Sequence, residues 1–134
     1  MLNHEPLRLA DGEYRFACLV WDNEPLPSGQ LVALAAEGLG WKKSTTYTVL
    51  KKLCERGVLQ NADGRVTSLI KKEDVQQAES AAVVDKTFDG SLPRFVAAFL
   101  NSKPISDAEA AEIRAGDPAP DGSGPLELAR GIEI

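Results

Sequence analysis

The stretch that decides the fold is residues 40–66, GWKKSTTYTVLKKLCERGVLQNADGRV. Its first part has helical spacing, with an apolar side made of Thr46, Val49, Leu50, Leu53 and Cys54. Gly57 ends that pattern, and residues 58–60 and 66–70 then favour two β-strands joined by a turn at residues 62–64. The stretch therefore predicts a helix followed directly by a β-hairpin.

Two shorter helices are predicted before this stretch. Asp11 is a candidate N-cap for a helix over 11–22, whose apolar side is read as Tyr14, Ala17, Cys18 and Trp21. The segment DNEPLP breaks the pattern with two prolines. Ser28 is the candidate cap of a second helix that carries Leu31, Val32, Leu34 and Ala35 and ends at Gly38 and Gly40. Ser44 is the corresponding candidate for the third helix.

The polar side of the third helix combines hydroxyl groups with long cations. Its members are Ser44, Thr45, Tyr47, Thr48, Lys51 and Lys52, with Lys42 and Lys43 just before them. Hydroxyls can bond to base edges, and lysines can reach phosphates or guanine. The hairpin adds Arg65, which can contact the DNA backbone or the minor groove. This is the pattern of a winged helix-turn-helix, in which the third helix reads the major groove.

Charge is distributed unevenly along the chain. The 134 residues carry a net charge of −5, which by itself argues against nucleic acid. Residues 41–72, however, contain eight Lys and Arg and two Asp and Glu, a net of +6, so the remainder carries −11. A cationic block within an acidic chain is typical of a segment that contacts phosphates.

The second half of the chain predicts three more helices. The first, over about 72–88, places Val75, Ala78, Ala82 and Val83 on one side. The next has a broad apolar stripe, a candidate dimerisation surface, made of Leu92, Phe95, Val96, Phe99 and Leu100. Ser106 and Glu109 form a capping box for the last helix, which ends at Gly116.

The fold class predicted is therefore mainly α with a small β-hairpin wing. The expected organisation is a winged helix-turn-helix DNA-binding domain at 1–71, a helical dimerisation region at 72–116 and a flexible tail at 117–134. The alternative for the apolar stripe is that it folds back onto its own domain.

Several function classes find no support in the residues. The sole histidine, His4, stands near no cluster with ligand spacing, so neither an enzyme nor a metal site nor a cofactor is expected. Cys18 and Cys54 lie on apolar helix sides and are expected to behave as small hydrophobes. The charged start and the lack of a long apolar stretch predict a cytoplasmic protein with no membrane insertion.

The sequence from Gly40 to Val66 resembles the penicillinase repressor family, of BlaI/MecI type and including CopY-like repressors. The matching features are Trp21, Trp41, Thr45, Thr48, Leu50, Leu53 and the Gly64-Arg65 pair. Residues 90–116 resemble the family's dimerisation region, so the likeness covers about residues 7–116.

The resemblance implies a homodimeric transcriptional repressor that binds pseudo-palindromic operator DNA. It further implies control of β-lactam or cell-wall stress genes, hence antibiotic resistance, and removal by a membrane sensor protease. Ala98 and Phe99 stand where that family has the asparagine–phenylalanine bond that is cut, so Ala98 departs from the family pattern. No cysteine follows Cys54, which favours the BlaI/MecI branch over the copper-sensing one with its Cys-x-Cys site.

A second hypothesis is a winged-helix scaffold that binds proteins without specific DNA recognition. A scaffold has no need of six net positive charges gathered on one helix and its hairpin, so charge favours the repressor.

Overall fold

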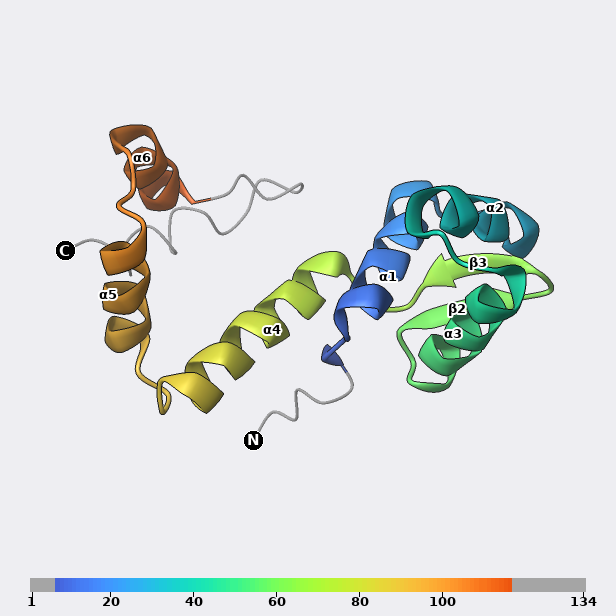
Figure 1. Ribbon diagram of the computed structural model, residues 1–134, viewed down its shortest axis with the longest axis horizontal. Coiled ribbons are helices and arrows are strands. Elements are labelled where there is room, and N and C mark those ends of the chain that lie inside the picture. The colour runs from blue at the N-terminus through green and yellow to red at the C-terminus, as the bar shows by residue number, and fades with distance from the viewer. Residues whose placement is uncertain (1–6, 117–134) are drawn as a thin grey trace. The chain divides into compact units, whose positions relative to one another are not determined.

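The computed structural model describes residues 7–116, and the chain divides into two compact units, Met1–Asp89 and Gly90–Ile134. The first unit contains the helices α1 (Asp11–Asn23), α2 (Ser28–Leu39), α3 (Lys43–Glu55) and α4 (Lys72–Thr87). It also contains the strands β1 (Leu26–Pro27), β2 (Leu59–Ala62) and β3 (Arg65–Ser68). Within this unit, α1, α2 and α3 gather around the small sheet (Figure 1).

The sheet has three antiparallel strands in the order β1-β3-β2. Strands β2 and β3 form the predicted hairpin, with Ala62 opposite Arg65 across the turn. Strand β1 pairs Leu26 with Val66 on the other side of β3 and was not predicted. The prediction of a mainly helical fold with a winged helix-turn-helix is confirmed.

The core of the first unit draws residues from all three of its first helices and from the sheet. Its fully buried members include Phe16, Val20, Leu26, Leu31, Leu53, Val58, Leu59 and Val66. Trp41 closes this core from the loop before α3, where its ring stacks on Phe16 with centroids 5.4 Å apart. The stacking explains why a tryptophan stands between the glycine turn and α3.

The predicted inner side of α1 was wrong by about one residue of rotation. The buried residues are Glu13, Phe16, Ala17 and Val20, whereas Tyr14, Cys18 and Trp21 are only half-buried. The error arose because Tyr14 and Trp21 are large and apolar, and they lie under α4 rather than in the core. In α4 itself Val75, Ala78 and Ala82 are buried, whereas Val83, predicted on the same side, is exposed.

Three predicted caps are also corrected. Asp11 and Ser28 are the first residues of their helices, and the N-cap positions belong to Ala10 and Pro27. Ser44 lies inside α3, whose N-cap position is Lys42. Of the predicted helix ends, Gly40 and Gly57 both adopt the left-handed conformation that closes a helix, whereas Gly38 lies inside α2.

The second unit contains α5 (Leu92–Ser102) and α6 (Asp107–Ala115) among its described residues. The Ser106 and Glu109 capping box is present, and Gly116 follows the last turn of α6 as predicted. The Ser91 side chain accepts a hydrogen bond from the backbone N–H of Arg94 and caps α5. The predicted tail, 117–134, lies outside the described residues.

Candidate nucleic-acid interface

Helix α3 presents its polar residues opposite its buried side. Thr46, Leu50 and Leu53 are buried against the core. Ser44, Thr48 and Lys51 are exposed and recur at three- and four-residue intervals on the opposite face. Thr45, Lys42 and Lys43 are exposed at the N-terminal end of the same helix. The structure thus brings the predicted hydroxyls and lysines to one side of one helix.

Two threonines of α3 already use their hydroxyl protons within the helix. Thr48 Oγ1 donates to the carbonyl of Ser44 at 2.9 Å, and Thr46 Oγ1 donates to the carbonyl of Lys42 at 3.1 Å. Exposed Thr48 therefore offers lone pairs, which suit the amino groups of adenine or cytosine in the major groove.

One flank of α3 is joined to α2. Tyr47 Oη lies 3.2 Å from Ser28 Oγ, and the Ser28 backbone N–H donates to the Gly64 carbonyl at 2.7 Å. Ser28 therefore links α3 to the turn of the hairpin. Sequence reasoning gave Ser28 only a capping role, because nothing local indicates a contact 19 residues away.

The other flank of α3 is joined to α1 by a buried carboxylate. Lys52 Nζ lies 2.9 Å from Glu13 Oε2, and Arg56 Nη1 lies 3.2 Å from Glu13 Oε1. The Ala10 backbone N–H also donates to Glu13 at 2.8 Å, and Arg56 donates to the Arg8 carbonyl. Sequence reasoning missed Glu13, although its position three residues before Phe16 and four before Ala17 places it on the inner side of α1.

The hairpin that follows α3 is the predicted wing. Asp63 and Gly64 at its turn both have positive φ, 54° and 81°, which matches the twist of a two-residue hairpin. Arg65 comes directly after this turn and is exposed, although its backbone lies on the central strand, paired with Ala62 and Pro27. The wing arginine thus lies on the central strand of the sheet, which is paired on both sides.

A hollow of about 380 Å³ lies between α3 and the first wing strand. Its lining residues are Tyr47, Leu50, Lys51, Cys54 and Asn61. Burial raises the pKa of the Cys54 thiol above its usual value of 9.0. A protonated thiol is a poor nucleophile, which agrees with the predicted packing role.

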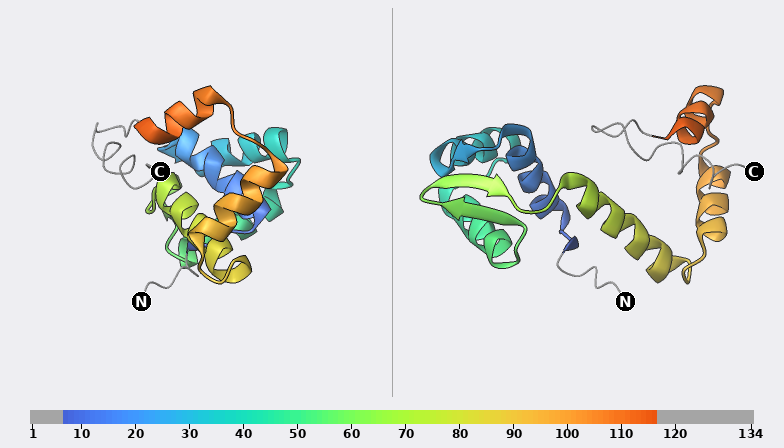
Figure 2. Two further views of the ribbon diagram at one scale, coloured as in Figure 1. Left: turned by 90° about the vertical axis from the view of Figure 1, so that its left-hand side faces the viewer. Right: turned by 180° about the vertical axis from the view of Figure 1, so that it is seen from behind.

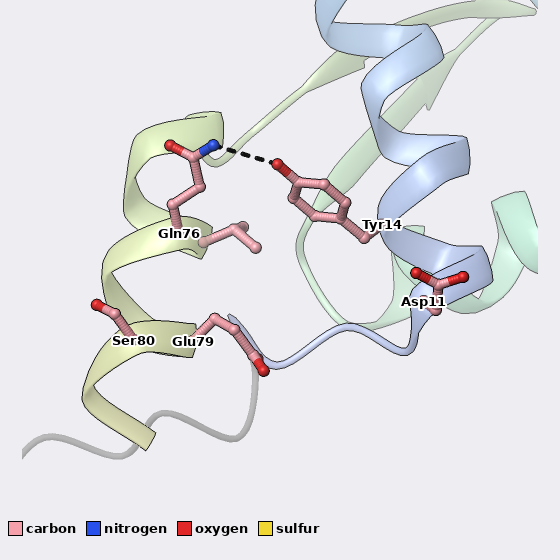
Figure 3. Close-up of a pocket in the computed structure, with 6 residues that line it drawn as sticks. Asp11, Tyr14, Gln76, Glu79 and Ser80 are labelled. Atoms are coloured by element: carbon pink, nitrogen blue, oxygen red, sulfur yellow. Dashed lines mark hydrogen bonds between the residues drawn. The ribbon is translucent and has the colours of Figure 1, made fainter. Parts of the chain in front are cut away.

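Helix α4 is attached to α1 beside a second hollow, of about 450 Å³ (Figure 3). Gln76 Nε2 donates to Tyr14 Oη at 3.2 Å, and Arg8 Nε forms an ion pair with Glu79 at 3.0 Å. The Ser80 hydroxyl, which also lines the hollow, donates to the carbonyl of Gln77. Gln76 and Glu79 thus join α4 to α1 and to the residues just before it.

Helix α5, seen again from two sides in Figure 2, has no buried residue within its own unit. Leu92, Val96, Phe99 and Leu100 are 59%, 39%, 49% and 38% exposed. Phe95 is half-buried, with its ring centroid 6.4 Å from that of Phe99. The apolar stripe predicted for dimerisation therefore exists as one surface, and Ala98 lies exposed in the middle of the same helix.

Among residues 7–116, no three histidine, cysteine, aspartate or glutamate side chains are placed to hold a metal ion. His4 lies outside the described residues. No helix in the described part of the chain is long and apolar enough to cross a bilayer.

A three-helix core, a reading helix with exposed hydroxyls and cations, and a wing together define a winged-helix DNA-binding protein. The model of the penicillinase repressor family matches residues 9–116. The chain belongs to this family, whose members are DNA-binding transcriptional repressors rather than enzymes and bind operator DNA as dimers.

Short segments of other proteins also match. The chain is 81% identical over 31 residues to the proline–tRNA ligase of Kineococcus radiotolerans, which covers 23% of this chain and 5% of the ligase. It is 81% identical over 26 residues to that of Leifsonia xyli subsp. xyli, covering 19% of this chain and 4% of the ligase. This chain spans about a twentieth of the ligases' length. The matching segment is shorter than a domain, so the match gives no reason to expect ligase activity.

Proposed function

We propose that this repressor reads its operator through α3 and the wing. The observation that carries the proposal is the gathering of Ser44, Thr45, Thr48 and Lys51 on the exposed side of α3, next to a wing that carries Arg65. Hydroxyls near the start of the helix suit base edges, and Lys42, Lys43, Lys51 and Arg65 suit phosphates. Tyr47 and Lys52 stand on the two flanks, where each also bonds to a neighbouring helix.

The same proposal places the dimer contact on α5. Five large apolar side chains on an 11-residue helix exceed what that helix can bury within its own unit, and all are left at least partly accessible. A second copy of α5 is the matching surface, because a two-fold pair presents two reading helices to a pseudo-palindromic site. The residues proposed for this contact are Leu92, Phe95, Val96, Phe99 and Leu100.

The proposed branch is the BlaI/MecI one, controlling β-lactam or cell-wall stress genes in the cytoplasm. Both cysteines of the sequence, at 18 and 54, lie in the winged-helix unit, and the sequence contains no Cys-x-Cys pair. Release by a membrane sensor protease would act on the Ala98–Phe99 bond. This bond lies inside helical α5, so cleavage would require that helix to open locally.

The experiment that tests the reading surface compares Thr45→Ala and Lys51→Ala with the unaltered chain on an operator and on a random duplex. Thr45→Ala should lower discrimination between the duplexes by about 1–3 kcal/mol. Lys51→Ala should weaken binding to both duplexes and reduce the salt slope by about one unit. Equal losses on both duplexes for Thr45→Ala would contradict base reading by this residue. Unchanged affinity and an unchanged salt slope for Lys51→Ala would remove this part of α3 from the interface.

A further inference from the structure

Adjacent lysines on α3 have different surroundings in the structure. Lys51 lines the hollow toward the wing, where Asn61 and Tyr47 are its neighbours. Lys52 points to the other flank, where its ammonium lies 2.9 Å from the Glu13 carboxylate on α1. Sequence alone treats the two lysines as equivalent, but helical geometry turns them about 100° apart.

Glu13 is the centre of the contact between α1 and α3. Its side chain is only 10% exposed, and its two carboxylate oxygens have different partners. One oxygen binds Arg56 and the Ala10 N–H, while the other binds Lys52. Lys52 and Arg56 are four residues apart, which is about one helical turn. One carboxylate therefore binds the C-terminal end of α3 through two side chains.

Moving a cation away from a buried carboxylate leaves the negative charge uncompensated, which destabilises the fold. A large rotation of α3 on α1 would lengthen the contacts of Glu13 with Lys52 and Arg56. The N-terminal half of α3 is held differently, through Tyr47 and Ser28. Glu13 therefore opposes rotation of α3 about its own axis, which would turn Thr48 and Ser44 away from a DNA groove.

We infer that Glu13 is a positioning residue for DNA reading, holding α3 in its reading orientation through Lys52 and Arg56, and that Lys52 serves this contact rather than a phosphate. The inference rests on the proposed function, since it assumes that α3 reads the operator. It divides the two adjacent lysines of α3 into a phosphate-facing member, Lys51, and an anchoring member, Lys52.

The test measures Glu13→Gln, Lys52→Met and Lys51→Ala in the full chain, with Glu79→Gln as the matched control. Glu79→Gln removes a carboxylate from another ion pair of the same unit, whose partner Arg8 meets Arg56 only through its backbone carbonyl. Binding to the operator and to random duplex is followed over a range of salt concentrations. Amide exchange of α3 is measured without DNA, at a temperature where every variant is folded.

Glu13→Gln is expected to lower the preference for operator about tenfold, the size of one lost base contact, and to leave the salt slope unchanged. It should also speed amide exchange in the second half of α3. Lys52→Met should behave similarly and keep the slope, whereas Lys51→Ala should reduce it by about one unit. Lys52→Met retains the Arg56 contact, so it remains informative if Glu13→Gln fails to fold.

A salt slope reduced equally by Lys52→Met and Lys51→Ala would overturn the inference, because Lys52 would then be a phosphate contact. An operator preference that Glu13→Gln and Glu79→Gln leave equally intact would overturn it too. If the unaltered chain preferred no duplex, the proposed function would fail, and the role of Glu13 in reading would fail with it.

Discussion

The indole Nε1 of Trp21 donates a hydrogen bond of 2.9 Å to the backbone carbonyl of Ile70, 49 residues further along the chain. Ile70 lies between the wing and α4, so the end of α1 fixes the point where the chain leaves the sheet. Tyr14 packs edge-on against Trp21 with ring centroids 5.9 Å apart, and its hydroxyl accepts from Gln76. One side of α1 thus holds the DNA-binding core, and the other holds the base of α4.

The Trp21 contact predicts a measurable loss of stability. Trp21→Phe keeps an aromatic ring but leaves the Ile70 carbonyl without its donor, which should lower the free energy of unfolding by about 1 kcal/mol. Urea denaturation followed by circular dichroism measures this loss. Trp41→Phe serves as the comparison, because Trp41 packs by stacking its ring on Phe16. A Trp21→Phe protein as stable as the unaltered chain would show that this hydrogen bond contributes nothing net.

The wing turn predicts a cost that comes only from the backbone. Gly64 has φ of 81° and open space where a Cβ would stand, so Gly64→Ala should destabilise the fold by about 1–2 kcal/mol through conformation alone. Gly29 in α2 also has open space but an ordinary φ. Gly29→Ala should therefore stabilise by about 0.5–1 kcal/mol. Thermal unfolding of the two variants checks the prediction, and a stabilised Gly64→Ala protein would contradict it.

Acid should weaken the contact between α1 and α3. Burial raises the pKa of Glu13, but the Ala10 N–H, Lys52 and Arg56 outweigh it and hold the pKa below its usual value of 4.5. The folded pKa is thus below the unfolded one. The carboxylate therefore stabilises the fold above about pH 4.5, and this contribution disappears as the pH falls through the folded pKa.

Glu13→Gln should lower the free energy of unfolding at pH 7 by about 1–3 kcal/mol, because it removes the charge that both cations share. It should also flatten the decline in stability below about pH 4.5, as measured by denaturant titration at each pH. Parallel pH profiles for the variant and the unaltered chain would mean that Glu13 is not a source of the acid sensitivity.

The apolar side of α5 predicts a change of oligomeric state. Phe99→Glu places a charge in the proposed dimer contact, and burying an unpaired charge costs more than a helix of this size can offset. Sedimentation velocity should then show monomers. Asn101→Glu adds the same charge at an exposed position of the same helix and should leave the dimer intact. Dimers that persist with Phe99→Glu would place the contact elsewhere.

Much of the winged helix could be predicted from sequence, because its signals are local. Helical spacing located α3, Gly40 and Gly57 marked helix ends, and Asp63-Gly64 marked the wing turn. The amphipathic stripe of α5 was equally readable, since its apolar residues recur at helical intervals. Each of these features depends on residues a few positions apart.

The features that sequence reasoning missed depend on distant partners. Strand β1 is two residues long and contains Pro27, so only its pairing with β3 makes it a strand. Glu13 was not identified because the cations that bind it, Lys52 and Arg56, lie about 40 residues further along the chain. The inner side of α1 was misplaced for the same reason, since α4 covers the aromatic side that periodicity assigned to the core.

The measurement that tests the account most directly is fluorescence anisotropy of the purified chain on duplexes tiling the promoter upstream of its own gene. Random duplex serves as competitor at near-physiological salt. The account predicts tight binding confined to one inverted repeat, saturating at two chains per duplex. Weak binding of equal strength to every duplex, abolished by salt, would contradict it.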